Sequence, residues 1–216
     1  MMRRIDPDTL QRWYRLLDEP MLDFDCGTLC APHNDGVPWC CDPECSVPLL
    51  LRAELAMHRT RDNYWKPMRA RTAWDRQLAK DSNDADNVLC LCAGHDRCER
   101  DKRALVCRTF PFEPHVDGRG EILGLTYIHR REIPCPLYGR RRLAVNPAYV
   151  RNAIVYWREV FALYPDEREL YIGESRNCRR RHRRRAERVP LFVSPEADTP
   201  AAAAARRALI PLPRPR

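Results

Sequence analysis

Residues 88–113 read VLCLCAGHDRCERDKRALVCRTFPFE, and the rest of the chain must fold around this cysteine-bearing segment. It holds four of the eleven cysteines: Cys90, Cys92, Cys98 and Cys107. A second, proline-interrupted segment over 21–46 holds five more: Cys26, Cys30, Cys40, Cys41 and Cys45. Neither segment has the regular apolar pattern that would order it by packing alone. Bound metal would supply that order, because ligand capture and folding are linked in small metal domains.

The expected cellular compartment is inferred from the absence of targeting and membrane-spanning signals in the sequence. Basic residues near the start are not followed by an apolar stretch, so no targeting segment is predicted. The apolar run Leu49-Leu50-Leu51 is far too short to span a bilayer, and no membrane association is expected. We therefore expect a cytoplasmic protein, in which thiols stay reduced and many cysteines indicate metal binding or catalysis. An odd count of eleven cysteines also fits poorly with a closed disulfide framework.

The formal net charge of +8 belongs to one end of the chain. Residues 174–216 contain twelve arginines against four acidic residues, so residues 1–173 carry no net charge. We predict a metal-binding cysteine-cluster domain over 1–173, with its motifs in 22–138, and a disordered tail rich in Arg, Pro and Ala over 174–216. The tail could bind nucleic acid, but a solvated end is favoured because no aromatics are interleaved for base stacking.

The expected fold is α+β: a small, mainly helical domain around an irregular cysteine-ligated metal centre, with one β-hairpin. Cap and proline signals with helical periodicity predict helices over 7–18, 47–58, 63–80, 147–163 and 166–178. Asp117-Gly118 predicts the turn of the hairpin. Four tryptophans at helical spacing are expected in the core: Trp13, Trp65, Trp74 and Trp157.

Thiolates favour zinc, or iron in a sulfide cluster, and four cysteines complete either one closed zinc site or one four-iron cluster. Cys26 and Cys30 share one face if their segment is helical. Cys40 and Cys41 are adjacent, so they serve two centres, or one of them ligates and the other supports it. Arg108, directly after Cys107, is a candidate donor to cluster sulfur, or else an ordinary surface arginine.

These residues resemble a known family. The segments Phe24–Cys30, Cys40-Cys41, Cys92–Cys98, Cys107-Arg108-Thr109-Phe110-Pro111 and Cys135-Pro136-Leu137 are similar to the YkgJ-type cysteine-cluster proteins of bacteria and archaea. That family is described as a zinc- or iron-chelating domain, and some of its members are linked to protein modification. The resemblance implies metal ligation by Cys26, Cys30, Cys40 or Cys41, Cys92, Cys98, Cys107 and Cys135. It also implies that Arg108 and Phe110 surround the metal centre.

Two departures leave the ligand set open. The insert between Cys30 and Cys40 is long, and Cys45 and Cys90 are extra, so Cys90 could replace Cys92. His33 and His95 lie between cysteines and are alternative ligands of a mixed site. Two functions are accordingly expected as alternatives. The first is an iron–sulfur or zinc protein with a redox or protein-modification role. The second is a structural zinc domain that presents a protein- or nucleic-acid-binding surface. No acid–base pair marks the chain as an enzyme, and a protein partner is unidentified.

Overall fold

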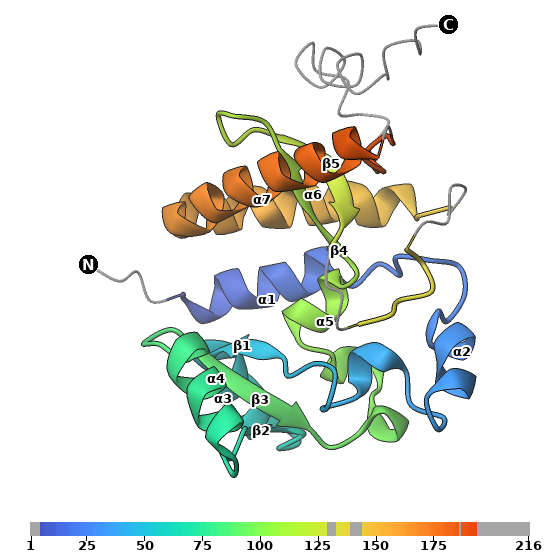
Figure 1. Ribbon diagram of the computed structural model, residues 1–216. Coiled ribbons are helices and arrows are strands. Elements are labelled where there is room, and N and C mark those ends of the chain that lie inside the picture. Colours follow the sequence, from blue (N-terminus) through green and yellow to red (C-terminus); the bar gives the residue numbers. More distant parts are fainter. Residues whose placement is uncertain (1–4, 129–132, 139–143, 186, 194–216) are drawn as a thin grey trace, which may run out of the picture. The chain divides into compact units, whose positions relative to one another are not determined.

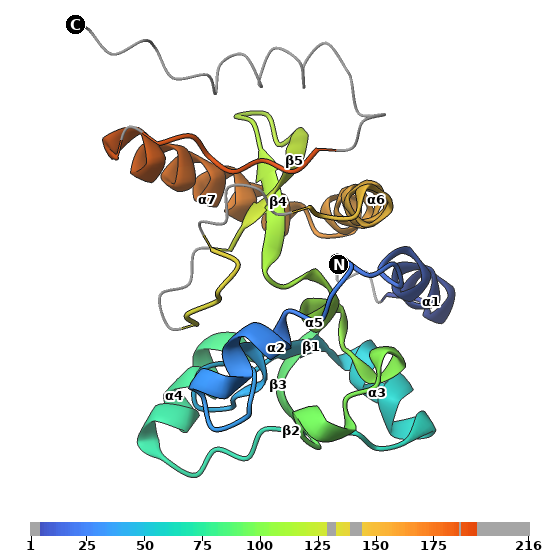
Figure 2. The same ribbon diagram turned by 90° about the vertical axis from the view of Figure 1, so that its right-hand side faces the viewer.

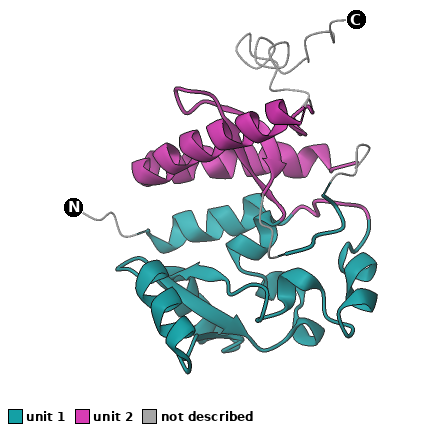
Figure 3. Cartoon of the chain, viewed as in Figure 1, with its two compact units in different colours: residues 1–18, 24–110, 130–139 teal, residues 19–23, 111–129, 140–216 magenta. Residues whose placement is uncertain are grey.

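The structure is a computed structural model that describes residues 5–128, 133–138, 144–185 and 187–193. The chain forms two compact units (Figure 3). Unit 1 comprises residues 1–18, 24–110 and 130–139, and unit 2 comprises residues 19–23, 111–129 and 140–216. The expected α+β class with a predominance of helix is confirmed (Figure 1). No helix among the described residues is long and apolar enough to cross a membrane.

Unit 1 begins with helix α1 (Pro7–Leu16), which confirms the first predicted helix. The Asp6 carboxylate accepts the backbone N–H groups of Asp8 and Thr9, and Pro7 takes the first helical position. Trp13, 1% exposed, lies on the buried face of the helix. Short turns follow at α2 (Gly27–Cys30), η1 (Ala31–His33) and η2 (Trp39–Cys41).

A small antiparallel sheet, which the sequence did not predict, forms the centre of unit 1 (Figure 2). Its strand order is β1-β3-β2, with β1 at Leu49–Leu51, β2 at Trp65–Pro67 and β3 at Asn87–Cys92. Helix α3 (Arg52–Arg61) follows β1, and helix α4 (Ala73–Ser82) connects β2 to β3. The predicted helices 47–58 and 63–80 were therefore wrong at their starts, because pairing with β3 draws both segments into strands.

Helix α4 also corrects one expectation about the core. It begins at Thr72, whose hydroxyl accepts the backbone N–H of Asp75 in a capping box. Trp74, in its first turn, is 74% exposed and is not a core residue, whereas Trp65 on β2 is 1% exposed. The turns η3 (His95–Arg97) and η4 (Arg100–Lys102) and helix α5 (Leu105–Thr109) complete unit 1.

Unit 2 is built on the predicted hairpin, formed by β4 (Phe112–Val116) and β5 (Ile122–Tyr127). Helix α6 (Pro147–Leu163), capped by Asn146, confirms the fourth predicted helix. Helix α7 (Pro165–Arg184) is longer than expected and continues through residue 174, where the tail was predicted to begin. Phe192 then pairs with Leu125 of β5. Residues 194–216, the remainder of the predicted tail, lie outside the described residues.

Candidate functional site

One group of thiols in unit 1 contains Cys26, Cys30 and Cys135. Cys26 precedes the single turn of α2 and Cys30 ends it, so the segment is helical, which is the condition under which the two side chains share one face. Burial, followed by the charges of Cys135 and Asp25 and then of Cys30, raises the pKa of Cys26 to about 11. The pKa of Cys135 is raised by burial and also by Cys30. Cys135, which is distant from Cys26 and Cys30 in the sequence, therefore lies close enough to both for their charges to interact.

A second group contains Cys92, Cys98 and Cys107. Cys92 ends β3, Cys98 follows η3, and Cys107 lies within α5. All three pack against the apolar core around Leu50 and Trp65. Burial, and then repulsion from the thiolates of Cys41, Cys98 and Cys92 among its neighbours, raises the pKa of Cys107.

The adjacent pair Cys40 and Cys41, on η2, interacts with both groups. A hydrogen bond from the Cys40 thiol lowers the pKa of Cys41 to about 7, with help from the positive charge of Arg103. The same hydrogen bond, with burial, raises the pKa of Cys40, and the charges of Cys26 and Cys107 add to this shift. Because Cys26 belongs to the first group and Cys107 to the second, the pair lies where the two groups meet.

The remaining cysteines and the two candidate histidines have other surroundings. Cys90 is fully buried in the apolar core of unit 1, opposite Pro67 on the neighbouring strand. The Cys45 sulfur lies 3.8 Å from the Asp42 carboxylate. His33 and His95 are exposed. Cys178 belongs to unit 2, where its sulfur lies 3.6 Å from His182 Nδ1.

Arg108 has partners that the sequence did not suggest. The side chain is 5% exposed, and its guanidinium donates to the carbonyl oxygens of Arg103 at 2.9 Å and Arg100 at 2.8 Å. It also donates to the Asp18 carboxylate at 3.1 Å, just beyond the carboxyl end of α1. The guanidinium lies 4.6 Å from the centre of the Tyr14 ring. These bonds tie α5 to the end of α1. Phe110, the other residue expected around the metal, is half-buried.

Sequence reasoning missed a buried polar network beside this site. The Tyr14 hydroxyl donates to Glu54 Oε1 at 2.6 Å and lies 2.8 Å from His58 Nε2. Glu54 Oε1 also accepts the backbone N–H of Leu105, the first residue of α5, at 2.7 Å. Burial raises the pKa of Glu54 and lowers that of His58 to about 4. The available signal was the spacing of Glu54 and His58, which places both on one face of α3.

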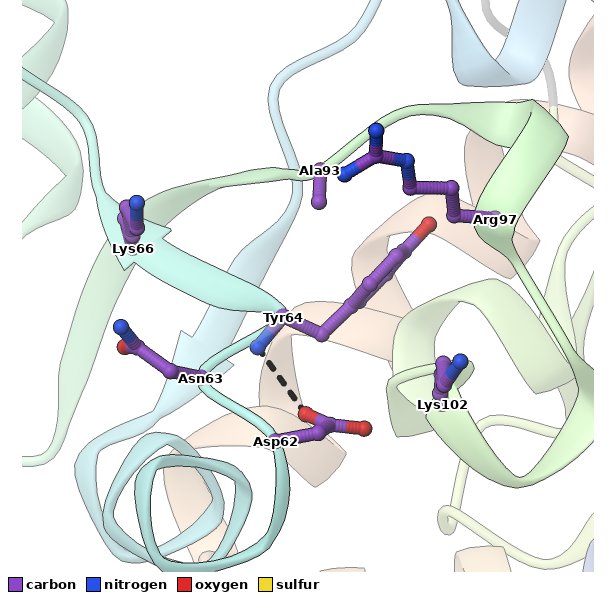
Figure 4. A pocket seen from close by; sticks show the side chains of 7 residues that line it. All are labelled: Asp62, Asn63, Tyr64, Lys66, Ala93, Arg97 and Lys102. Atoms are coloured by element: carbon purple, nitrogen blue, oxygen red, sulfur yellow. Dashed lines mark hydrogen bonds between the residues drawn. The ribbon is translucent and has the colours of Figure 1, made fainter.

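A cavity of about 360 Å³ adjoins the second thiol group (Figure 4). Figure 4 shows the Tyr64 side chain in its centre, among the residues Asp62, Asn63, Lys66, Ala93, Arg97 and Lys102. The Tyr64 hydroxyl donates to the Gly94 carbonyl at 2.5 Å. Burial raises the pKa of Tyr64, and hydrogen bonds with Cys98 and Cys92 add to the shift. With three cationic residues and one acidic residue in its lining, the cavity can hold an anionic group one aromatic ring away from two thiols.

The cysteine side chains do not surround a common point. Within the described residues, no three His, Cys, Asp or Glu side chains are arranged as one metal ion requires, and all eleven cysteines are free thiols. The site is a convergence of thiols from three chain segments. No protein-family model, curated protein or solved structure matches this chain.

Proposed function

We propose that unit 1 binds metal through eight cysteines, in two sets of four thiolates that hold zinc or iron–sulfur clusters. The observation that carries the proposal is the convergence of thiols from residues 26–41, 92–107 and 135. Cys26, Cys30 and Cys135 form one set with Cys40, and Cys92, Cys98 and Cys107 form the other with Cys41. The chain thereby divides its adjacent pair between two centres.

The chemistry of the donors fits such a centre. Each set supplies four sulfur atoms, which is the complement of a tetrahedral zinc site or of one four-iron cluster. Thiols must lose their protons to bind metal, and buried, mutually repelling thiols lose them readily only when a cation binds in their place. Arg103, whose charge acts on Cys41, offsets part of the negative charge of the second set. Capture of metal would draw the thiols around the ion, since ligand binding and folding are linked.

The centre supports one of two roles, in the cytoplasm where thiols stay reduced. An iron–sulfur cluster would supply electron transfer or a redox step in protein modification. The alternative is a structural zinc domain that presents a surface to a partner. The packing of Cys92, Cys98 and Cys107 against the apolar core suits this alternative, because a closed zinc site needs no access to solvent.

The test is purification of the full chain without oxygen, with measurement of bound metal, acid-labile sulfide and the visible spectrum. A brown protein with iron and sulfide supports the redox role, whereas a colourless one with stoichiometric zinc supports the structural role. A protein purified without either metal, and unable to take up either one after reduction, would refute the proposal.

Single substitutions test the division into sets. We expect Cys26→Ser and Cys98→Ser each to lose about half of the bound metal. Cys178→Ser, in unit 2, is the matched control and should keep all of it. Full metal content in both test variants would mean that the ligand assignment is wrong.

A further inference from the structure

Helix α7 carries an arginine face that the metal centre does not use. Arg176, Arg179, Arg180 and Arg183 lie three or four residues apart, so they occupy one side of the helix. They alone line a hollow of about 230 Å³. At 1.5 Å of rise per residue, the four side chains begin within roughly 11 Å of helix axis. The arginine face is therefore a dense, continuous strip of positive charge.

The described residues offset this charge only in part, since the Asp117 carboxylate acts on Arg179 without forming an ion pair. No ion pair joins any of the four arginines to an acidic side chain in the part of the chain that the structure describes. Like charges at these spacings destabilise a helix. The favourable effect of cations at a helix carboxyl end is confined to the last turn and does not extend to Arg176. An external anion with several charges would balance the arginine face.

Arg179 is held in place within this face. Its Nη1 donates to the Val116 carbonyl of β4 at 2.6 Å and lies 3.2 Å from His115 Nε2. On the buried side of α7 lie Ile172, Ser175 and Cys178. The helix is thus anchored on the hairpin of its own unit, while Arg176, Arg180 and Arg183 are exposed.

We propose that the arginine face of α7 binds the phosphate backbone of double-stranded DNA without reading its base sequence. Arginine suits this partner because its planar guanidinium forms paired hydrogen bonds with phosphate. A membrane is disfavoured, since an interfacial helix needs an exposed apolar side. On α7, Ile172 and Cys178 are buried, and Leu170 is a single exposed apolar residue.

Other nucleic acids fit less well. Single strands are bound by stacking bases on aromatic side chains, and no aromatic residue lines the hollow. A helix about 10–12 Å across matches the major groove of B-DNA, which is about 12 Å wide. The major groove of an RNA duplex is too narrow for side chains to enter. Duplex DNA is therefore the partner that the arginine face fits.

The salt dependence of binding gives the test. Each phosphate contact contributes about −0.9 to the slope of log affinity against log salt concentration. The variant Arg176→Gln, Arg180→Gln, Arg183→Gln keeps the buried bond of Arg179 and removes three contacts. We expect its slope to be shallower by about 2.7 than that of the unaltered chain, measured by fluorescence anisotropy with two labelled duplexes of unrelated sequence.

The matched control is Arg69→Gln, Arg71→Gln, Arg76→Gln, which removes the same charge from exposed positions of unit 1. It should leave the slope unchanged, and the unaltered chain should bind both duplexes equally. Both variants retain the arginines of residues 184–216, so the difference between slopes reports on α7 alone. Equal slopes for the α7 variant and the unaltered chain would overturn the proposal. Tighter binding to duplex RNA or to phosphatidylserine vesicles at the same salt concentration would also overturn it.

Discussion

Replacement of Arg108 separates a role in folding from a role at the metal. The guanidinium donates to two backbone carbonyls, those of Arg100 at 2.8 Å and Arg103 at 2.9 Å, from a side chain that is 5% exposed. Loss of a buried partner costs about 1–3 kcal/mol per group left unsatisfied. The bond to Asp18 adds less than about 1 kcal/mol, because that carboxylate is 68% exposed and screened by water. We expect Arg108→Met to lower the free energy of unfolding by about 3–4 kcal/mol.

Arg108→Lys should destabilise the fold less than Arg108→Met does. An ammonium group keeps the charge but lacks the planar fork that reaches both carbonyls, so we expect a loss of about 2 kcal/mol. The assay is anaerobic urea denaturation followed by tryptophan fluorescence, with bound metal measured per folded molecule. Arg61→Met is the control, since Arg61 pairs with Asp101 at the surface and should cost less than about 1 kcal/mol.

The two roles predict different outcomes for Arg108. If Arg108 ties α1 to α5, the folded fraction of Arg108→Lys keeps its metal content and visible spectrum. The reasoning is refuted if Arg108→Met costs no more than Arg61→Met. A changed spectrum in Arg108→Lys at unchanged stability would instead support hydrogen bonding to sulfur.

Three further predictions concern other positions. Burial and the neighbouring cations lower the pKa of His115 to about 4, so the folded chain resists protonation below pH 6.5. The contribution of His115 to the free energy of unfolding should therefore be complete above pH 6.5 and should fall by about 3 kcal/mol towards pH 4. His115→Gln should remove this part of the pH dependence, as measured by urea denaturation at pH 7 and at pH 4. Gly124→Ala should lower the free energy of unfolding by about 2 kcal/mol and expose residues 187–193 to protease. The reason is that φ at Gly124 is +155° and an added Cβ would lie 2.5 Å from the carbonyl oxygen of Phe192. Gly118→Ala is the control and should change neither the stability nor the protease sensitivity. Trp13→Ala should cost about 3–5 kcal/mol in the same denaturation assay, and Trp74→Ala less than about 0.5 kcal/mol.

The elements that were predicted correctly have local signals. Asp6-Pro7 and Asn146-Pro147 each combine a capping side chain with a proline at the first helical position, and both helices begin there. The Asp117-Gly118 turn likewise marks the hairpin within its own few residues. In each case the side chain and the backbone groups that it contacts lie within four residues of one another, so a local sequence pattern can predict the element.

The strands of unit 1 were missed because their partners are distant in sequence. Leu49–Leu51 pairs with a strand almost forty residues further on, and three apolar residues give no period from which a strand could be distinguished from a helix. Trp65 and Trp74 show the same limit, because Trp65 is buried on β2 whereas Trp74 is exposed on α4. Periodicity alone could not separate them.

For the candidate site, the sequence could propose the member residues but not their grouping in space. Cysteine composition and the family resemblance named the eight thiols. The proximity of Cys135 to Cys26, or of Cys107 to Cys41, depends on the tertiary fold. Arg108 shows the same limit, since its partner Asp18 lies ninety residues earlier in the chain.

The division of unit 1 into three stretches, 1–18, 24–110 and 130–139, has a consequence for how the protein is made. The last of the eight thiols, Cys135, follows the hairpin of unit 2 in the sequence. A chain emerging from the ribosome has already released seven of these cysteines before Cys135 appears. Since chains begin to fold amino-terminus first during synthesis, these seven thiols pass through a stage without Cys135 in which they can react with oxygen or with another nascent chain. Recombinant yield should therefore depend on the redox state of the cell during translation.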